Sequence, residues 1–249
     1  MSERTTHFGY RTVDEDQKTR LVRGVFDSVA SKYDLMNDLM SAGVHRLWKT
    51  AMVDWLGPRE GQTFIDVGGG TGDIAQRILD RLGAESGSMT VCDINHEMIA
   101  VGRDRAVDAG RLAGIQWVCG DAEKLPFPDM SFDAFTIAFC LRNVTHIDDA
   151  LGEARRVLKP GGRFLCLEFS QVVVPLLGKL YDAYSFTVLP ALGGLVTGDA
   201  DAYRYLAESI RKFPSQSELL ARMTSAGLRE CKMRNLSGGI AALHSGWRI

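Results

Sequence analysis

The sequence is short of the residues that hold small secreted or metal-bound folds together. Its five cysteines are odd in number and none forms a C-x-x-C pair, so we expect neither a disulfide framework nor a zinc site. The five histidines are scattered without the spacing of metal ligands, and no metal is expected. Apolar side chains never run for the roughly 18 residues of a membrane span, and the polar N-terminus is unlike a secretory signal.

An excess of charge of one sign is also absent. The 29 Lys and Arg residues nearly balance the 31 Asp and Glu residues, which leaves a net charge of -2. A protein without a basic field is not expected to bind nucleic acid. With 249 residues, 45% of them hydrophobic and 24% charged, the chain is typical of a globular protein, which we expect in the cytoplasm.

The chain divides into a part with helical periodicity and a longer part in which strands and helices alternate. We expect a flexible tail over residues 1–18 and a single domain over residues 19–249. Apolar residues at three- and four-residue spacing predict a helical cap over residues 19–58. Thr145 is a suitable N-cap for one later helix. Seven β-like runs follow the cap, at Gln62–Val67, Met89–Asp93, Ile115–Cys119, Phe132–Phe139, Arg163–Phe169, Leu228–Asn235 and Ile240–Ile249.

Strands that alternate with helices predict an α/β fold, in which a mainly parallel seven-stranded sheet carries helices on both faces. Ligands of such sheets bind beyond the carboxyl ends of the strands, where the strand order reverses, and we expect the site there. One segment departs from this pattern. Residues 171–214 begin with an apolar stretch broken by Gly and Pro, which predicts a helical insertion. It either packs on the core or forms an apolar wall for a greasy substrate.

The richest motif joins the first strand to a helix at residues 66–73, D-V-G-G-G-T-G-D. Its glycines allow a tight turn and a close approach of the backbone to a ligand. A dinucleotide fingerprint has glycines at positions one, three and six, but counting from Gly68 places Asp73 at position six. An acid there would face a pyrophosphate, whereas it suits the sulfonium and ammonium of S-adenosylmethionine. The charges therefore favour S-adenosylmethionine over NAD(P).

Acidic residues also follow the next two strands. Asp93 ends the second strand, where a carboxylate can accept hydrogen bonds from the ribose hydroxyls of either nucleoside. Asp121 follows the third strand and can accept a hydrogen bond from an adenine amino group, while the Ala122 N–H can donate to the ring. Each acid alone could cap a helix or face solvent. Acids at three successive strand ends, Asp66 included, indicate one shared binding site.

Longer motifs extend along most of the chain. The opening V-F-D-S-V-A-S-K-Y-D-L-M-N at residues 25–37 and L-R-N-V at residues 141–144 are specific, whereas the glycine loop and L-K-P-G-G at residues 158–162 are general to methyltransferases. Together they resemble a class I S-adenosylmethionine-dependent methyltransferase. They are most similar to the ubiquinone/menaquinone biosynthesis C-methyltransferases of the UbiE type. The resemblance covers about residues 20–248.

This resemblance implies a Rossmann-like fold and methyl transfer from S-adenosylmethionine to a ring carbon of a reduced polyprenyl quinone precursor, a demethyl-benzoquinol or a demethylmenaquinol. It implies cofactor contacts from Thr71, Asp93 and the Asp121-Ala122 pair. Ala138 stands where the family has a serine, so a contact there cannot use a hydroxyl. The expected cofactor-binding residues are Asp66, Gly68, Gly70, Thr71, Asp93, Ile94, Asp121, Ala122 and Ala138.

The resemblance also suggests catalytic residues. Arg142 is expected to orient a water or to stabilise a developing phenolate, because a guanidinium does not readily deprotonate. An ion pair with a nearby carboxylate is the alternative. Asn143 either orients the same hydroxyl or caps a turn, and Tyr33 either closes the pocket or packs in an amphipathic helix. His146 is a less favoured candidate for the base.

Several interpretations stay open. The acceptor could be another small apolar molecule, or the chain could be a non-catalytic S-adenosylmethionine-binding subunit of a quinone-synthesis assembly. An NAD(P)-dependent oxidoreductase is disfavoured by Asp73. A quinol with a polyprenyl tail suits the apolar stretch after the fifth strand. Peripheral contact at the inner membrane surface, a quinone-biosynthesis assembly and a homodimer also stay open as partners.

Overall fold

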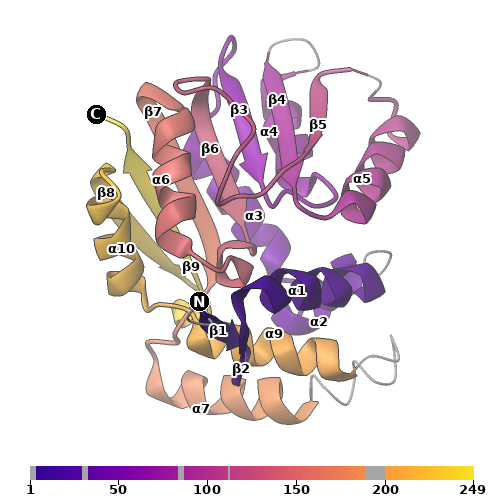
Figure 1. Ribbon diagram of the computed structural model, residues 1–249, viewed down its shortest axis with the longest axis vertical. Coiled ribbons are helices and arrows are strands. Elements are labelled where there is room, and N and C mark those ends of the chain that lie inside the picture. Colours follow the sequence, from indigo (N-terminus) through magenta and orange to yellow (C-terminus); the bar gives the residue numbers. More distant parts are fainter. Residues whose placement is uncertain (1–3, 30–32, 84–86, 112, 189–199) are drawn as a thin grey trace.

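A computed structural model describes residues 4–29, 33–83, 87–111, 113–188 and 200–249. Its centre is a seven-stranded sheet with the strand order β5-β4-β3-β6-β7-β9-β8 (Figure 1). The first five strands in this order run parallel, while β9 pairs antiparallel with both β7 and β8. The predicted α/β fold with a mainly parallel sheet is confirmed. The strands are β3 (Thr63–Val67), β4 (Ser88–Asp93), β5 (Ile115–Cys119), β6 (Phe132–Ala138), β7 (Leu158–Phe169), β8 (Arg229–Leu236) and β9 (Ala241–Trp247).

Side chains alternate across the strands and contribute to two separate cores. On β3, Phe64 packs with α3, α4 and α9 on one face, while Ile65 packs with α6 and α10 on the other. Helices therefore cover both faces of the sheet, as predicted (Figure 1). These helices and the one that follows β4 are α3 (His45–Leu56), α4 (Asp73–Leu82), α5 (His96–Asp108), α6 (Ile147–Val157), α9 (Ala200–Lys212) and α10 (Gln216–Ser225).

The prediction of a flexible tail over residues 1–18 is wrong for the part that the structure describes. Residues 5–14 form a hairpin that packs on α9. Phe8 and Val13 are buried, and the Phe8 ring stacks on the Tyr205 ring with centroids 4.0 Å apart. Each strand carries a single apolar residue, Phe8 or Val13, which is too little for a periodic signal in the sequence. The N-terminal elements are β1 (Thr5–Phe8), β2 (Arg11–Asp14), α1 (Glu15–Val29) and α2 (Tyr33–Ser41).

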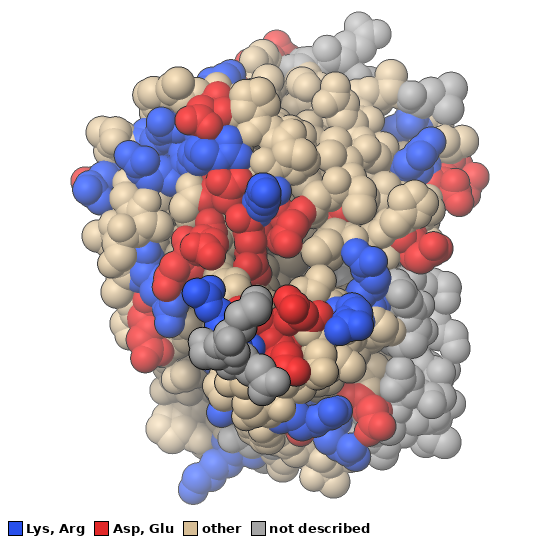
Figure 2. Space-filling view, in the orientation of Figure 1, with Lys and Arg blue, Asp and Glu red and all other residues tan. Residues whose placement is uncertain are grey.

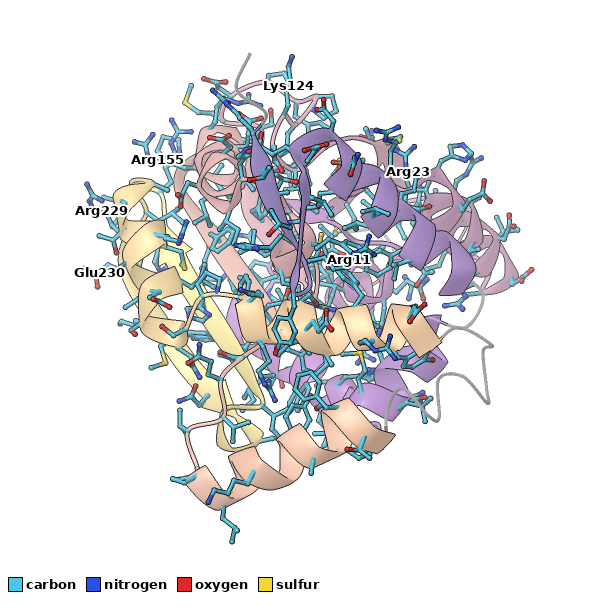
Figure 3. All side chains as sticks on the ribbon, turned by 60° about the horizontal axis from the view of Figure 1, so that its bottom comes forward. Arg11, Arg23, Lys124, Arg155, Arg229 and Glu230 are labelled. Atoms are coloured by element: carbon cyan, nitrogen blue, oxygen red, sulfur yellow. The ribbon has the colours of Figure 1, made fainter. Side chains whose placement is uncertain are left out.

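The segment after β7 is helical over much of its described length. It contains α7 (Pro175–Ala183), the π-helical turn η3 (Tyr184–Val188) and α9. Figures 1 and 3 both show α7 at the edge of the molecule, beyond α9, so that α9 lies between α7 and α1. Among the described helices, none is long and apolar enough to cross a membrane.

The N-terminal hairpin makes a testable contribution to stability. Phe8→Ala removes a buried ring that stacks on Tyr205. We expect the free energy of unfolding to fall by about 3 kcal/mol, the usual cost of emptying an aromatic site. Chemical denaturation measures it, and Thr12→Ala, at an exposed position of β2, is the matched control with a change of less than about 0.5 kcal/mol. Equal stability of the two variants would support the prediction of a flexible N-terminal tail.

Candidate active site

A pocket lies at the carboxyl ends of β3, β4, β5 and β6. The strand order reverses between β4 and β6 on either side of β3, which is where open α/β sheets bind ligands. The helix α1 forms the roof of the pocket. The residues of successive helical turns that line it are Thr19, Val22, Arg23 and Phe26. The predicted location of the site thus coincides with the cavity.

The glycine loop after β3 forms the floor. Gly68 has a φ of +61°, and a Cβ added to it would lie 2.1 Å from the Cys140 Sγ, so only glycine fits between the ends of β3 and β6. The Gly68 N–H donates to the Cys92 carbonyl at 2.7 Å. Gly70 has a φ of +52°, and its N–H donates to the Asp93 Oδ2 at 2.8 Å. Both glycines line the pocket, as predicted for cofactor-binding residues.

Asp93 lies between the glycine loop and the start of α5. One carboxylate oxygen accepts from Gly70 and the other accepts from the Asn95 N–H at 2.8 Å. Burial raises the pKa of Asp93, and the backbone hydrogen bonds from Asn95 and Gly70 oppose that shift. The carboxylate is thus held rigidly at the pocket edge, with lone pairs left for the hydroxyls of a ligand. Four other predicted residues line the pocket beside it, Ile94, Asp121, Ala122 and Asn143.

Polar contacts tie the roof to the strand ends. Lys18 of α1 donates to the Val144 carbonyl at 2.9 Å, and Arg23, labelled on α1 in Figure 3, donates to the Ile94 carbonyl at 3.1 Å. The His146 imidazole lies between two carboxylates, 2.6 Å from Glu123 and 3.1 Å from Glu15 of α1. The hydrogen bond with Glu123 raises the pKa of His146.

These contacts leave an acidic surface beside the roof. In Figure 2, acidic side chains gather near the middle of the face shown, and Glu15, Asp16, Asp121 and Glu123 line one shallow cavity on the molecule. Glu123 also accepts from the backbone N–H groups of Thr145 and His146. The helix α6 therefore has His146 at its N-cap position, and the Thr145 cap predicted from the sequence is not formed.

The turn after β6 separates two of the predicted catalytic residues. In this 3-10 turn, η2 (Leu141–Asn143), Asn143 faces the pocket, but Arg142 does not line it. The Arg142 side chain is 1% exposed and pairs with Glu168 of β7, Nη1 to Oε1, at 2.5 Å. It also donates to the Phe139 carbonyl at 2.7 Å, and Phe139 has a φ of +55°, a strained conformation for a bulky residue. The ion-pair interpretation of Arg142 therefore describes this structure.

Three predicted cofactor residues lie outside the pocket lining. Asp66 is 1% exposed and accepts from the Thr136 hydroxyl at 2.7 Å; burial raises its pKa to about 7. Thr71 lines a different cavity, with Arg105, on the outer side of the loop. Ala138 ends β6 and does not line the pocket, whereas the next two residues, Phe139 and Cys140, do. Cofactor contacts from these three residues stay predictions. The Tyr33 side chain lies outside the described part of the structure.

The structure corrects the expectation that the Asp73 carboxylate faces a bound ligand. Its carboxylate pairs with Lys49 at 2.7 Å and with Arg77 at 2.6 Å, and it does not line the pocket. Burial alone would raise the pKa of Asp73, but these two cations hold it below the ordinary value. The acids that do face the pocket are Asp93, Asp121 and Glu123.

The lining of this pocket fits S-adenosylmethionine. A pyrophosphate would meet three carboxylates and one cation, Arg23, whereas a sulfonium and an ammonium would meet mainly opposite charge. The glycine floor would be filled by any Cβ, and the pocket walls are mainly apolar, as an adenine requires. The sequence analysis did not identify Thr19, Val22 and Phe26 as pocket residues. The pattern of an amphipathic helix predicts which face is buried, but not that this face covers a ligand pocket.

The close approach at Gly68 can be tested against a matched glycine. Gly68→Ala would push the loop away from Cys140 and should weaken the binding of S-adenosylhomocysteine, a stand-in for the cofactor, by about tenfold or more. Gly57 has the same φ of +61° but nothing within 4 Å, so Gly57→Ala should lower stability by about 1–2 kcal/mol and leave binding unchanged. Titration calorimetry measures both variants. If they bind equally well, the loop is not the cofactor floor.

Comparisons with known proteins show what this chain is similar to. The model of the ubiE/COQ5 methyltransferase family matches residues 11–248. The Ubiquinone/menaquinone biosynthesis C-methyltransferase UbiE of Paracoccus denitrificans is 60% identical over 98% of this chain and 97% of that protein, and the protein of that name from Brucella abortus is 57% identical over 97% and 90%.

Among solved structures, a SAM-dependent methyltransferase from Thermotoga maritima superposes with a TM-score of 0.64 at 21% identity, over 91% of this chain and 99% of that one. One from Aquifex aeolicus superposes with a TM-score of 0.60 at 18% identity, over 81% and 89%. These two share the fold. The family match and the identity along the whole chain settle the relationship: the chain belongs to the ubiE/COQ5 methyltransferase family.

Proposed function

We propose that this chain is an S-adenosylmethionine-dependent C-methyltransferase of ubiquinone/menaquinone biosynthesis, which methylates a ring carbon of a reduced polyprenyl quinone precursor. The observation that carries the proposal is the pocket at the switch point of the sheet, in a chain 57–60% identical to enzymes named for that reaction. A glycine floor and facing carboxylates suit a sulfonium nucleoside, and the adjacent turn after β6 offers a polar group to an acceptor.

Six residues of the pocket would hold the cofactor. The glycine loop admits it closely through Gly68 and Gly70, Asp93 would accept from ribose hydroxyls, and Asp121 with Ala122 would bind the adenine edge. Ile94 contributes apolar contact. When bound, S-adenosylmethionine supplies an electrophilic methyl group. The chain's own work is to fix positions, and orientation of two reactants can contribute about 7–11 kcal/mol to lowering a barrier.

The acceptor must be electron-rich at the carbon that receives the methyl group. A hydroquinol ring meets this requirement when one of its hydroxyls is partly deprotonated. Asn143 lies at the pocket wall, where its amide can bind that hydroxyl. We propose that Arg142 acts from below, by holding the η2 turn and the strained Phe139 through its pair with Glu168. Direct contacts of Arg142 and Tyr33 with the acceptor stay predictions.

A labelled-methyl assay tests the function. Purified chain, methyl-labelled S-adenosylmethionine and a dithionite-reduced, short-tailed demethyl-quinol should yield label on a ring carbon in the organic extract. Oxidised quinone is the matched control and should take up none, because its ring is electron-poor. If S-adenosylhomocysteine binds but no label is transferred to a benzoquinol or a naphthoquinol, the cofactor assignment stands and the acceptor assignment is wrong.

We also propose a peripheral contact with the cytoplasmic surface of the inner membrane. Exposed apolar side chains gather on α7, on η3 and at the hairpin turn, where the Tyr10 and Phe186 rings lie 6.4 Å apart. Lys212 and Arg211 lie over these two rings and would face anionic headgroups. We name this the apolar surface: Tyr10, Val173, Val174, Leu176 and Phe186, each at least 40% exposed.

Vesicle sedimentation tests the contact. With vesicles of phosphatidylglycerol and phosphatidylethanolamine, Leu176→Ser should weaken binding by about tenfold, because Leu176 is 71% exposed and would lose its apolar contact. Val107 is 55% exposed on α5, which Figure 1 shows far from α7, and Val107→Ser should bind as the unmodified chain does. Equal binding of both variants would reject this surface. A homodimer and a quinone-biosynthesis assembly stay predictions; light scattering of the purified chain decides the first.

A further inference from the structure

We propose that Tyr205 is a positioning residue, which orients the Asn143 amide so that its NH2 group faces the acceptor. The inference deepens the proposed function and rests on it. It assigns a role to a residue of α9, 62 positions along the chain from the turn that it acts on. No motif in the sequence connects the two residues.

The hydrogen bond between them has a defined direction. The Tyr205 hydroxyl donates to the Asn143 Oδ1 at 3.0 Å. Tyr205 is 4% exposed, and burial raises the pKa of its phenol, so the hydroxyl keeps the proton that it donates to the amide oxygen. The amide oxygen is therefore occupied by Tyr205, and the other end of the amide, which carries two N–H donors, is left for the pocket.

Both partners are held in place. The Tyr205 ring stacks on Phe8 with an interplanar angle of 14°, and so the hairpin keeps the hydroxyl aimed at η2. The backbone N–H of Asn143 donates to the Cys140 carbonyl at 2.8 Å, which fixes the turn itself. The amide is thus positioned by two separate elements, α9 with the hairpin from one side and the strand end from the other.

The orientation matters because the two ends of an amide have opposite polarity. An acceptor hydroxyl that gives up its proton leaves negative charge on its oxygen, which an N–H donor stabilises and a carbonyl oxygen repels. By accepting from Tyr205, the Asn143 oxygen is turned away from that charge. Tyr205 does not contact the acceptor and transfers no proton; it acts only through Asn143.

The first test is Tyr205→Phe, which keeps the ring and its stack on Phe8 but removes the donor. We expect kcat to fall about tenfold, the kcat–pH profile to move to higher pH because the acceptor hydroxyl ionises less readily, and the affinity for S-adenosylhomocysteine to stay unchanged. Tyr181→Phe is the matched control: Tyr181 is 8% exposed, its hydroxyl faces the Met40 carbonyl, and it does not line the pocket. An unchanged kcat and pH profile in Tyr205→Phe would overturn the proposal.

Two further variants separate positioning from folding. In an Asn143→Ala background, Tyr205→Phe should cause no additional loss, whereas a merely structural role predicts losses that multiply. Asn143→Asp keeps an acceptor for the Tyr205 hydroxyl but has no N–H to offer, and should lose as much activity as Asn143→Ala while melting near the unmodified chain. Retained activity in Asn143→Asp, or multiplied losses in the double variant, would refute the assignment.

A measurement without turnover keeps this proposal distinct from the function. The side-chain NH2 resonances of Asn143, identified by their loss in Asn143→Ala, should be sharp in the unmodified chain and broadened or shifted in Tyr205→Phe but not in Tyr181→Phe. This holds even if no quinol is methylated, so failure of the labelled-methyl assay and failure of the Tyr205 assignment give different results. Identical resonances in all three proteins would show that Tyr205 does not hold the amide.

Discussion

The buried pair of Arg142 and Glu168 is the interaction on which the site depends. Burying two opposite charges is favourable only when their remaining hydrogen-bonding groups are satisfied, and here Glu168 also accepts from the backbone N–H of Phe169 and of Arg142 itself. The pair joins the end of β7 to the turn after β6. It holds Phe139, which lines the pocket, in a left-handed conformation whose strain costs about 1–3 kcal/mol.

A second constraint comes from the N-terminal part of the chain, which completes a pocket that the sheet leaves open on one side. The helix α1 covers the strand ends, and its polar ties reach two loops. Arg23 donates to the loop before α5, and Lys18 and Glu15 contact the loop between η2 and α6. The hairpin before α1 supports Tyr205 through Phe8. The hairpin and the first turns of α1 carry no recognisable motif, yet they enclose the pocket that the motif residues form.

The sequence predicted the sheet, its helices and the strand-end pocket, because periodicity and glycine-rich turns are local signals. Gly68, Gly70, Asp93 and Asp121 line the pocket for that reason. Pairings between distant positions could not be predicted. The charge of Asp73 suits a sulfonium ligand, but the carboxylate pairs with Lys49, which comes 24 residues earlier.

The same limit applies to the turn and the hairpin. The resemblance places Arg142 at the acceptor, with an ion pair as the alternative, and nothing local identifies Glu168, 26 residues later, as its partner. The four-residue strands of the hairpin each hold a single apolar residue, so the sequence carries no periodic signal for them. Burial on a distant helix, not local propensity, stabilises them.

The place of β9 in the sheet has a consequence for synthesis on the ribosome. This strand is the last element of the chain, yet it lies between β7 and β8 and pairs with both. Until its residues leave the exit tunnel, β7 presents an open apolar edge, and β8 has no neighbour to pair with. A chain that stops short of residue 241 therefore cannot close its sheet. Truncated products that lack β9 keep this edge open and are exposed to proteolysis.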